Sequence, residues 1–234
     1  MAVSVVMAAC NGEKYIKEQL DSILCQLSKE DELIVSLDPS TDGIKDILLE
    51  YTKKYPQVKV LNGPGKGLIK NFENGLKHVS SEYIFLCDQD DVWKKNKVET
   101  VLSAFEDNTL LVMHDAEVVD SDLNVIQNSY YSIRKSGCGV WKNIWKNSYV
   151  GCCMAIRKEL LDYILPFPNK LPMHDQYIGL VAEMNGNVKF IRDSLILYRR
   201  HSGNSSDMKH ASFIQMMKWR VEIISAVVMY KFGR

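Results

Sequence analysis

The sequence predicts one α/β domain whose mostly parallel central sheet carries helices on both faces. Short apolar runs rich in β-branched residues recur along the chain, each run ends in a turn of Asn, Asp, Gly or Pro, and a stretch with helical spacing follows. Strands that alternate with helices of about ten residues are typical of βαβ units and of a parallel sheet. In such sheets, ligands bind beyond the carboxyl ends of the strands.

The elements of the N-terminal half follow this pattern in order. Strands are expected at Val3–Ala9, Glu32–Leu37, Val58–Leu61 and Tyr83–Cys87. Helices are expected at Tyr15–Leu27, Ile44–Tyr51, Leu68–His78 and about Asn96–Glu106, because apolar residues recur there at helical spacing. Polar clusters at Asn11, Asp38 and Asp88 follow three of the strands, so we expect them to share one crevice.

The pattern loosens in the C-terminal half. Expected there are a strand at Leu110–His114, a helix around Lys158–Ile164, a helix from near Asp175, and late strands at Val188–Ile191 and Leu195–Tyr198. The segment 136–154 mixes Gly, Trp, Tyr and Cys and has no assignable periodicity. We divide the chain into a main domain, residues 1–208, and a C-terminal helix within residues 209–234.

This C-terminal helix is expected to be amphipathic. Its apolar stripe consists of Ile214, Met217, Val221, Ile224 and Val228, which Met216, Trp219, Ile223, Val227 and Tyr230 widen. Such a helix either packs on the domain or lies at a membrane surface, where Lys231 and Arg234 would favour headgroups.

Composition and charge exclude several classes of protein. The 234 residues are 46% hydrophobic, and 29 basic side chains balance 29 acidic ones, so no net field would attract nucleic acid. No apolar run reaches the roughly 18 residues of a membrane span. Six cysteines without a Cys-x-x-Cys pair favour a reducing compartment. We therefore expect a cytoplasmic protein, either soluble or held peripherally at the inner face of the plasma membrane.

The strongest local signal is Asp88-Gln89-Asp90-Asp91, which follows an apolar strand. Carboxylates this close repel one another unless a cation joins them, and Mg²⁺ binds through one or two carboxylates while keeping sites for phosphate oxygens. Capping of the next helix is the alternative, but it accounts for one aspartate and not for three. The run therefore predicts a divalent cation beside a diphosphate leaving group, whose growing charge the cation would neutralise.

Three further motifs carry candidate residues, each with a plainer alternative. Asp38, in Asp38-Pro39-Ser40-Thr41-Asp42, suits a nucleobase or ribose, or else forms an Asx turn. Asp175, in Pro172-Met173-His174-Asp175-Gln176, is a candidate general base, or else a helix cap. His201, in Tyr198-Arg199-Arg200-His201, is a candidate metal ligand beside phosphate-binding arginines, or else a packed or solvated histidine.

In their order, these motifs resemble those of the inverting nucleotide-sugar glycosyltransferases of family 2, which have the Rossmann-like GT-A fold. The matching segments are Val5-Val6-Met7-Ala8-Ala9-Cys10-Asn11-Gly12, Asp38-Pro39-Ser40-Thr41-Asp42, Asp88-Gln89-Asp90-Asp91-Val92-Trp93, Met173-His174-Asp175-Gln176 and Tyr198-Arg199-Arg200-His201. Within the family, the chain is most similar to the bacterial rhamnosyltransferase-like enzymes that build surface polysaccharides.

The resemblance implies a role for each matching position. The nucleotide would be held by Ala8, Cys10, Asp38, Asn71, Asp88 and Gln89, with Asp88 near the ribose. Asp90 would contact Mg²⁺ or Mn²⁺, and His201 would help to close the metal and diphosphate site. Asp175 would be the catalytic base.

The implied function is transfer of a sugar, with inversion, from a UDP- or dTDP-sugar to a hydroxyl of a saccharide acceptor, free or lipid-linked. Two rival functions stay open on the sequence alone. A nucleotidyltransferase also combines an α/β nucleotide site with carboxylate-held Mg²⁺. A non-catalytic scaffold that binds nucleotide sugars would need no general base.

Overall fold

The computed structural model describes residues 1–201 and 212–232. Within these residues, nine strands form one sheet: β1 (Val3–Ala9), β2 (Glu32–Leu37), β3 (Val58–Asn62), β4 (Tyr83–Asp88), β5 (Val92–Trp93), β6 (Thr109–Val119), β7 (Val125–Gln127), β8 (Met154–Arg157) and β9 (Asn187–Arg199). The strand order is β3-β2-β1-β4-β8-β6-β9-β5, and β7 pairs with β6. Strands β1 to β4 pair with one another in parallel, and β6 pairs with β9 in parallel, whereas β5, β7 and β8 pair with their neighbours in antiparallel orientation. The predicted mostly parallel sheet is confirmed.

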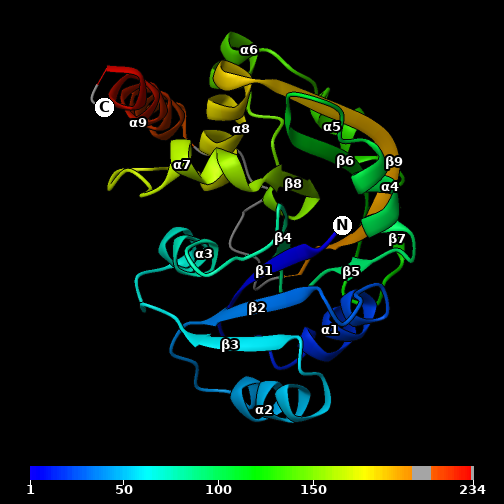
Figure 1. Ribbon diagram of the computed structural model, residues 1–234. Helices are drawn as coiled ribbons and strands as arrows, with labels where there is room; N and C mark the ends of the chain where they lie inside the picture. The colour runs from blue at the N-terminus through cyan, green and yellow to red at the C-terminus, as the bar shows by residue number, and fades with distance from the viewer. Residues whose placement is uncertain (202–211, 233–234) are drawn as a thin grey trace.

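Helices accompany the sheet along its length, and Figure 1 shows the sheet curling from β3 to β9. In the described residues they are α1 (Ile16–Leu24), α2 (Ile44–Lys54), α3 (Leu68–Leu76), α4 (Lys97–Ser103), α5 (Tyr130–Arg134), α6 (Val140–Trp145), α7 (Leu161–Ile164), α8 (His174–Asn185) and α9 (Phe213–Phe232), with 3-10 turns η1 (Gly151–Cys153) and η2 (Lys158–Leu160). Every residue of β1 is buried. Since successive side chains of a strand point to opposite faces, both faces of the sheet are covered there.

The strands after β4 differ from the sequence prediction in several places. The expected strand at Leu110–His114 extends to Val119, and the two expected late strands are one strand, β9, whose pairing with β6 contains three register shifts. Two residues, Val92–Trp93, form the additional strand β5. A strand of two residues is too short to show a periodicity in the sequence. It is defined only by its pairing with β9 in the folded chain.

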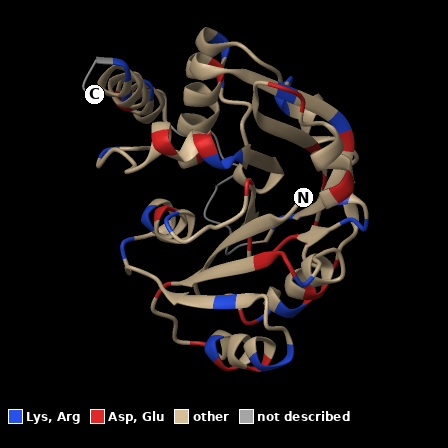
Figure 2. Cartoon of the chain, in the orientation of Figure 1, with Lys and Arg blue, Asp and Glu red and all other residues tan. Residues whose placement is uncertain are grey.

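Charged side chains are spread over the whole molecule. Figure 2 shows Lys and Arg interspersed with Asp and Glu on both halves of the sheet. This distribution agrees with the balanced composition, and any anionic ligand must therefore be held by local contacts rather than by a long-range field.

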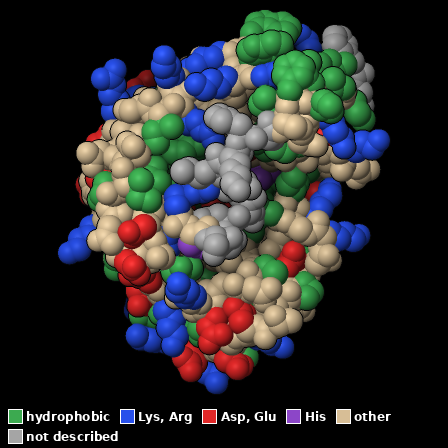
Figure 3. Space-filling view, turned by 180° about the vertical axis from the view of Figure 1, so that it is seen from behind, with side chains coloured by type: hydrophobic (Ala, Val, Ile, Leu, Met, Phe, Trp, Pro, Cys, Tyr) green, Lys and Arg blue, Asp and Glu red, His purple; other side chains and the backbone are tan. Residues whose placement is uncertain are grey.

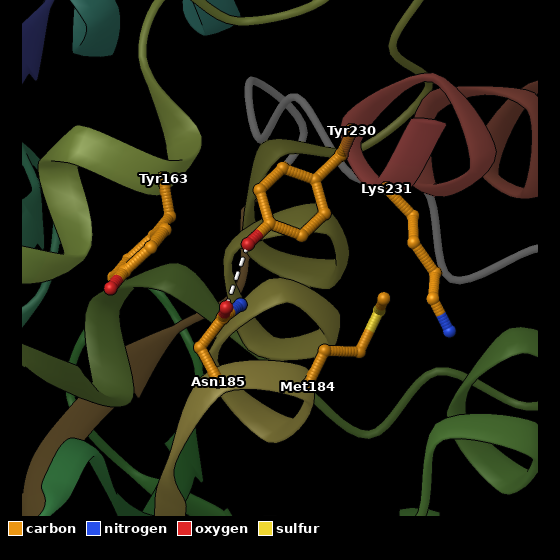
Figure 4. Close-up of a pocket in the computed structure, with 5 residues that line it drawn as sticks. All are labelled: Tyr163, Met184, Asn185, Tyr230 and Lys231. Atoms are coloured by element: carbon orange, nitrogen blue, oxygen red, sulfur yellow. Dashed lines mark hydrogen bonds between the residues drawn. The ribbon is translucent and has the colours of Figure 1, made fainter. Parts of the chain in front are cut away.

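Helix α9 packs on the domain through residues that widen the expected stripe, and not through the centre of that stripe. Ile223, Ala226 and Val227 are buried, whereas most of the expected stripe, Ile214, Val221, Ile224 and Val228, is exposed. The Tyr230 hydroxyl donates a hydrogen bond of 2.7 Å to Oδ1 of Asn185 on α8, as Figure 4 shows. The proposed domain boundary between residues 208 and 209 and the side chain of Arg234 lie outside the described residues. Among the helices described, none is both long and apolar enough to cross a membrane.

Glu32 anchors the end of β2 opposite the polar crevice. Its side chain is buried, lies 2.6 Å from Lys59 Nζ, and accepts hydrogen bonds from the Ser4 hydroxyl and from Ser80 N–H and Oγ–H. Burial alone would raise the pKa of Glu32, but the hydrogen bonds from Lys59, Ser4 and Ser80 outweigh it and lower the pKa to about 2.

We expect Glu32→Gln to lower the free energy of unfolding by about 2 kcal/mol at pH 7, measured by urea denaturation. Because the pKa of Glu32 is lowered on folding, its contribution is present above the ordinary glutamate pKa and is lost as the pH falls toward about 2. The difference between variant and wild type should therefore shrink at pH 3. Glu82→Gln, at the exposed ion pair with Arg157, is the matched control and should cost less than about 1 kcal/mol. An equal loss in both variants would contradict the account of Glu32.

Candidate active site

Three adjacent strands bring the first polar clusters together. Ala8 of β1 is paired with Asp88 of β4, and Leu37 of β2, next to Ala9 in the register, directly precedes Asp38. The Gln89 side chain then joins two of the strand ends, because its Oε1 accepts from Cys10 N–H at 2.9 Å and its Nε2 donates to Cys10 O at 2.8 Å. The polar clusters expected to meet at the carboxyl ends of the strands therefore do lie together.

Asp38 and Asn71 lie at the β2 side of this crevice. Asp38 Oδ1 accepts from Gly65 N–H at 2.8 Å, so the Asx turn weighed as the alternative is not what holds this carboxylate. Asn71 Nδ2 donates to Ala9 O at 3.2 Å, while its buried Oδ1 has no partner among the described residues. A Cβ on Gly63 would come within 2.4 Å of Asp38 Oδ1 and 2.7 Å of Asn71 Oδ1, so both acceptors face the same small space.

Asp88 lies in a concentration of negative charge. Burial, then the charges of Asp90 and Asp175, raise its pKa to about 7. The opposing effects, a hydrogen bond from the Cys152 thiol and the positive charge of Lys97, are smaller. Asp175, which is 85 or more residues from Asp88 and Asp90 in sequence, thus acts on Asp88 in the folded chain.

Asp90 and His201 face each other directly. His201 Nε2 lies 2.8 Å from Asp90 Oδ2, and both side chains are mostly buried. Arg199 holds this corner, since its Nε donates to Asp90 O at 2.8 Å and its guanidinium also pairs with Glu18. The His201 ring lies 4.7 Å from the ring of Tyr15. The structure thus joins the end of β9 to the aspartate run after β4, as predicted.

Asp91 has a structural environment that differs from that of its neighbours. It is fully buried, and its Oδ1 accepts from Arg199 N–H at 2.9 Å. Burial, with the charges of Asp90 and Asp88, raises its pKa well above the ordinary value. The helix that follows, α4, has Asn96 at its N-cap, so neither Asp90 nor Asp91 caps it.

Asp175 lies in the first turn of α8, at the opposite wall of the crevice. The N-cap residue is Met173, so Asp175 does not take the capping position that was the alternative. Burial raises the pKa of Asp175 to about 6, against hydrogen bonds from the backbone N–H groups of Gln176, Asp175 itself and Gly151 and the charge of Arg134. A carboxyl group with this pKa is mostly ionised at pH 7 and is suited to accept a proton.

The segment that the sequence left unassigned supplies contacts to the site. Turn η1 lies between two of the aspartates, because Gly151 N–H donates to Asp175 and the Cys152 thiol donates to Asp88. On α5, Arg134 Nε donates to the Tyr130 hydroxyl at 3.0 Å, and both side chains interact electrostatically with Asp175. No sequence signal marks these residues, since their roles come only from tertiary contacts.

The carboxylates fit a hard divalent cation. One ligand atom each from Asp88, Asp91 and Cys152 lies within 4.8 Å of the others. A hydrogen bond to Cys153 and burial raise the pKa of the Cys152 thiol well above its ordinary value, so the thiol is protonated and is a poor ligand for a hard ion. Asp90 Oδ2 and His201 Nε2, which lie 2.8 Å apart, offer a second pair of ligand atoms next to Asp88 in the sequence.

A separate pocket of about 390 Å³ lies between α7, α8 and α9. Figure 4 shows the side chains that line it, Tyr163, Met184, Asn185, Tyr230 and Lys231. Met184 and Asn185 are near the C-terminal end of α8, nine and ten residues beyond Asp175, which corresponds to about 15 Å along the helix. This pocket is therefore distinct from the aspartate crevice.

Solved structures share this fold. Staphylococcus aureus TarS (residues 1–349) in complex with UDP-GlcNAc superposes with a TM-score of 0.72 at 25% identity, over 97% of this chain and 67% of that one. A mannosyltransferase of Pyrobaculum calidifontis in complex with GDP-Man and Mn²⁺ superposes with a TM-score of 0.63 at 17% identity, over 97% of this chain and 62% of that one, and shows the fold alone. The fold is that of the GT-A glycosyltransferases.

Sequence comparison gives the family. The profile described as Glycosyl transferase family 2 matches residues 4–165. The dTDP-rhamnosyl transferase RfbG of Shigella flexneri is 32% identical over 219 residues, covering 85% of this chain and 72% of that protein. The chain therefore belongs to glycosyltransferase family 2, as the motifs implied.

Two further relatives extend the comparison. The UDP-Glc:alpha-D-GlcNAc-diphosphoundecaprenol beta-1,3-glucosyltransferase WfgD of Escherichia coli is 27% identical over 208 residues, covering 87% of this chain and 78% of that protein. An uncharacterized glycosyltransferase of Nostoc sp. is 24% identical over 214 residues, and this chain spans 66% of its length. Both relatives therefore have residues beyond the region that matches this chain.

Proposed function

We propose that this chain transfers a sugar from a nucleoside diphosphate to a hydroxyl of a saccharide acceptor, with inversion at the anomeric carbon. One observation carries the proposal: turn η1 links Asp175 to Asp88 at the ends of β1, β2 and β4. Gly151 N–H donates to Asp175, a Cβ on Gly151 would lie 4.0 Å from Asp175 Cβ, and the neighbouring Cys152 thiol donates to Asp88. A base beside a diphosphate site is what a single displacement requires.

The donor nucleotide would lie over the ends of β1 and β2. The unpartnered Oδ1 of Asn71 and the neighbouring Asp38 carboxylate offer acceptors to base or ribose donors, and Cys10 and Gln89 form the adjoining wall beside the buried Ala8. A UDP- or dTDP-sugar is the proposed donor. Support comes from TarS, which was solved with UDP-GlcNAc, and from RfbG, a dTDP-rhamnosyl transferase by name.

A divalent cation, Mg²⁺ or Mn²⁺, would be held by Asp90 and His201, with Asp88 toward the ribose. When bound, such a cation neutralises negative charge that develops on a departing diphosphate. The protein's own part is to fix the ligands: Arg199 binds the backbone oxygen of Asp90, and Tyr15 packs against the His201 ring. Burial, then the charges of Asp90 and Asp175, raise the pKa of Asp88, and a bound cation would balance those charges.

Asp175 would take the proton of the acceptor hydroxyl as that oxygen attacks the anomeric carbon and the bond from the sugar to the diphosphate breaks. One displacement inverts the anomeric configuration. Arg134 and Tyr130, which both interact electrostatically with Asp175, face the acceptor side. An aromatic ring suits the apolar face of a sugar, and a guanidinium suits a phosphate group, so the pair fits a lipid-linked saccharide carried on a diphosphate. The name of WfgD describes such an acceptor, and it supports the proposal of a role in bacterial surface polysaccharide synthesis.

Incubation of the purified chain with several nucleotide sugars and Mg²⁺ or Mn²⁺ tests the proposal. We expect metal-dependent release of the nucleoside diphosphate from a UDP- or dTDP-sugar, and faster release when a saccharide acceptor is added. Pyrophosphate release from a nucleoside triphosphate would instead indicate a nucleotidyltransferase. Binding of the nucleotide sugar with neither hydrolysis nor transfer would indicate a non-catalytic scaffold.

A further inference from the structure

Helices α6 and α9 together expose a cluster of large apolar side chains. Trp141 and Trp145 of α6 are 82% and 65% exposed. On α9, five exposed apolar residues share one side of the helix: Phe213, Ile214, Val221, Ile224 and Val228. Figure 3 shows hydrophobic side chains gathered at this end of the molecule, with Lys and Arg side chains beside them. We call these seven residues the tryptophan face.

The two helices form one surface. Arg220 of α9 donates from Nη2 to Trp145 O at 3.1 Å, and its guanidinium lies 4.3 Å from the Trp145 ring. At about 100° per residue, the five α9 members fall within an arc of about 100°, and Phe213 and Ile224 are the members closest to the Arg220 edge. The apolar stripe of α9 therefore adjoins the tryptophans of α6.

Core packing does not account for this face. Helix α9 is held on the domain by Ile223, Ala226 and Val227, and by the hydrogen bond from Tyr230 to Asn185. These residues lie on a different side of the helix from the exposed stripe. The stripe is thus an additional apolar surface on a helix that already packs on the domain through another side. Exposed apolar patches of this extent on a protein surface mark interaction sites.

The charges around the tryptophan face indicate the partner. Lys142 and Lys146 follow Trp141 and Trp145 in sequence and are exposed, and Lys218 lies at the other edge on α9. Segment 140–146 contains no acidic residue, and Glu222 of α9 is opposed by Lys218 at 3.9 Å. Exposed tryptophans flanked by lysines on a convex helical surface are typical of segments that lie at the interface of an anionic bilayer.

We propose that the tryptophan face docks the protein on the surface of a bilayer that contains anionic lipids. Helix α9 packs on the end of α8 that carries Asn185, and α8 runs from there to Asp175, about 15 Å away along its axis. Docking would therefore hold the acceptor wall of the crevice near the bilayer. The inference does not depend on the proposed reaction, because vesicle binding is measured without any substrate.

Flotation of the purified full chain with vesicles tests the proposal. We expect recovery with vesicles of phosphatidylcholine and phosphatidylglycerol, and little with phosphatidylcholine alone. Trp141→Ser/Trp145→Ser should lower the partition coefficient at least about tenfold, because each indole loses its burial in the interface. Lys142→Gln/Lys146→Gln should lower the partition coefficient for anionic vesicles about fivefold for each lysine. The partition coefficient for neutral vesicles should not change.

The matched control is Val125→Ser/Ile126→Ser on β7, whose side chains are also about half exposed, at 51% and 50%. This variant should bind vesicles like the wild type. The proposal is overturned if the tryptophan variant and the control bind equally, or if neutral vesicles bind as well as anionic ones. It is also overturned if the wild type ignores vesicles and forms a dimer by sedimentation that the tryptophan variant loses. Should the tryptophan variant unfold, the lysine variant still decides, since its substitutions touch only exposed positions.

Discussion

Asp175→Asn is expected to lower kcat by about 10² to 10⁴ while donor affinity stays within about twofold of wild type. The amide preserves the volume of the side chain and can still accept from Gln176 N–H at Oδ1, but it cannot take a proton from the acceptor hydroxyl. Steady-state transfer rates and calorimetric titration with the nucleoside diphosphate measure the two quantities separately.

The pH dependence of kcat tests the same role of Asp175 separately. Because the pKa of Asp175 is raised to about 6, the base is protonated below that pH, so kcat at saturating donor and metal should rise through about pH 6 and level off above it. This limb should be absent from the residual activity of Asp175→Asn. The matched control is Asp107→Asn, at an exposed position, which should retain the wild-type rate and profile. A rate for Asp175→Asn within about threefold of wild type would show that another group is the base.

Asp90→Ala has the second large expected effect, on metal-dependent nucleotide binding. The substitution removes a carboxylate that lies 2.8 Å from His201 and leaves the neighbouring Asp88 in place. We expect the affinity for the nucleoside diphosphate in the presence of Mn²⁺ to fall at least about tenfold, about 1.4 kcal/mol, and the difference between titrations with Mn²⁺ and with a chelator to vanish. Calorimetry measures both, without turnover.

The control for this experiment is Asp122→Ala, which removes an exposed carboxylate from the turn between β6 and β7. It should leave the metal dependence unchanged. If Asp90→Ala also binds nucleotide with wild-type metal dependence, the cation is held by other residues, and Asp88 with Asp91 becomes the pair to test.

The parts of the fold that could be predicted are those with strong local patterns. Strands β1, β2, β3 and β4 are continuous apolar runs, and their observed bounds differ from the expected ones by one residue at most. The aspartates at their carboxyl ends followed from the same runs, since parallel strands place their ends along one edge of the sheet. Local sequence therefore predicted well the edge of the sheet at which these strands end.

The acceptor side could not be predicted because long-range packing defines it. Strand β6 includes Asp115, a buried carboxylate held by Ser129 and by Tyr131 N–H, which interrupts the apolar pattern in the middle of the strand. The 3-10 turn η1 has no periodicity, and its contacts with Asp88 and Asp175 exist only in the folded chain. For α9, the sequence indicated an apolar helix but gave no information on which side would pack.

Strand β9 has a consequence for how the two walls of the crevice are spaced. It begins directly after α8, whose first turn holds Asp175, and after thirteen residues it ends at Arg199. Because alternate side chains of a strand point to opposite sides, deleting one residue near its end would turn Arg199 away from Glu18 and from the backbone of Asp90. The number of residues in β9, more than the identity of the partly exposed ones in its middle, therefore sets the separation between Asp175 and the corner where Arg199 binds the backbone of Asp90.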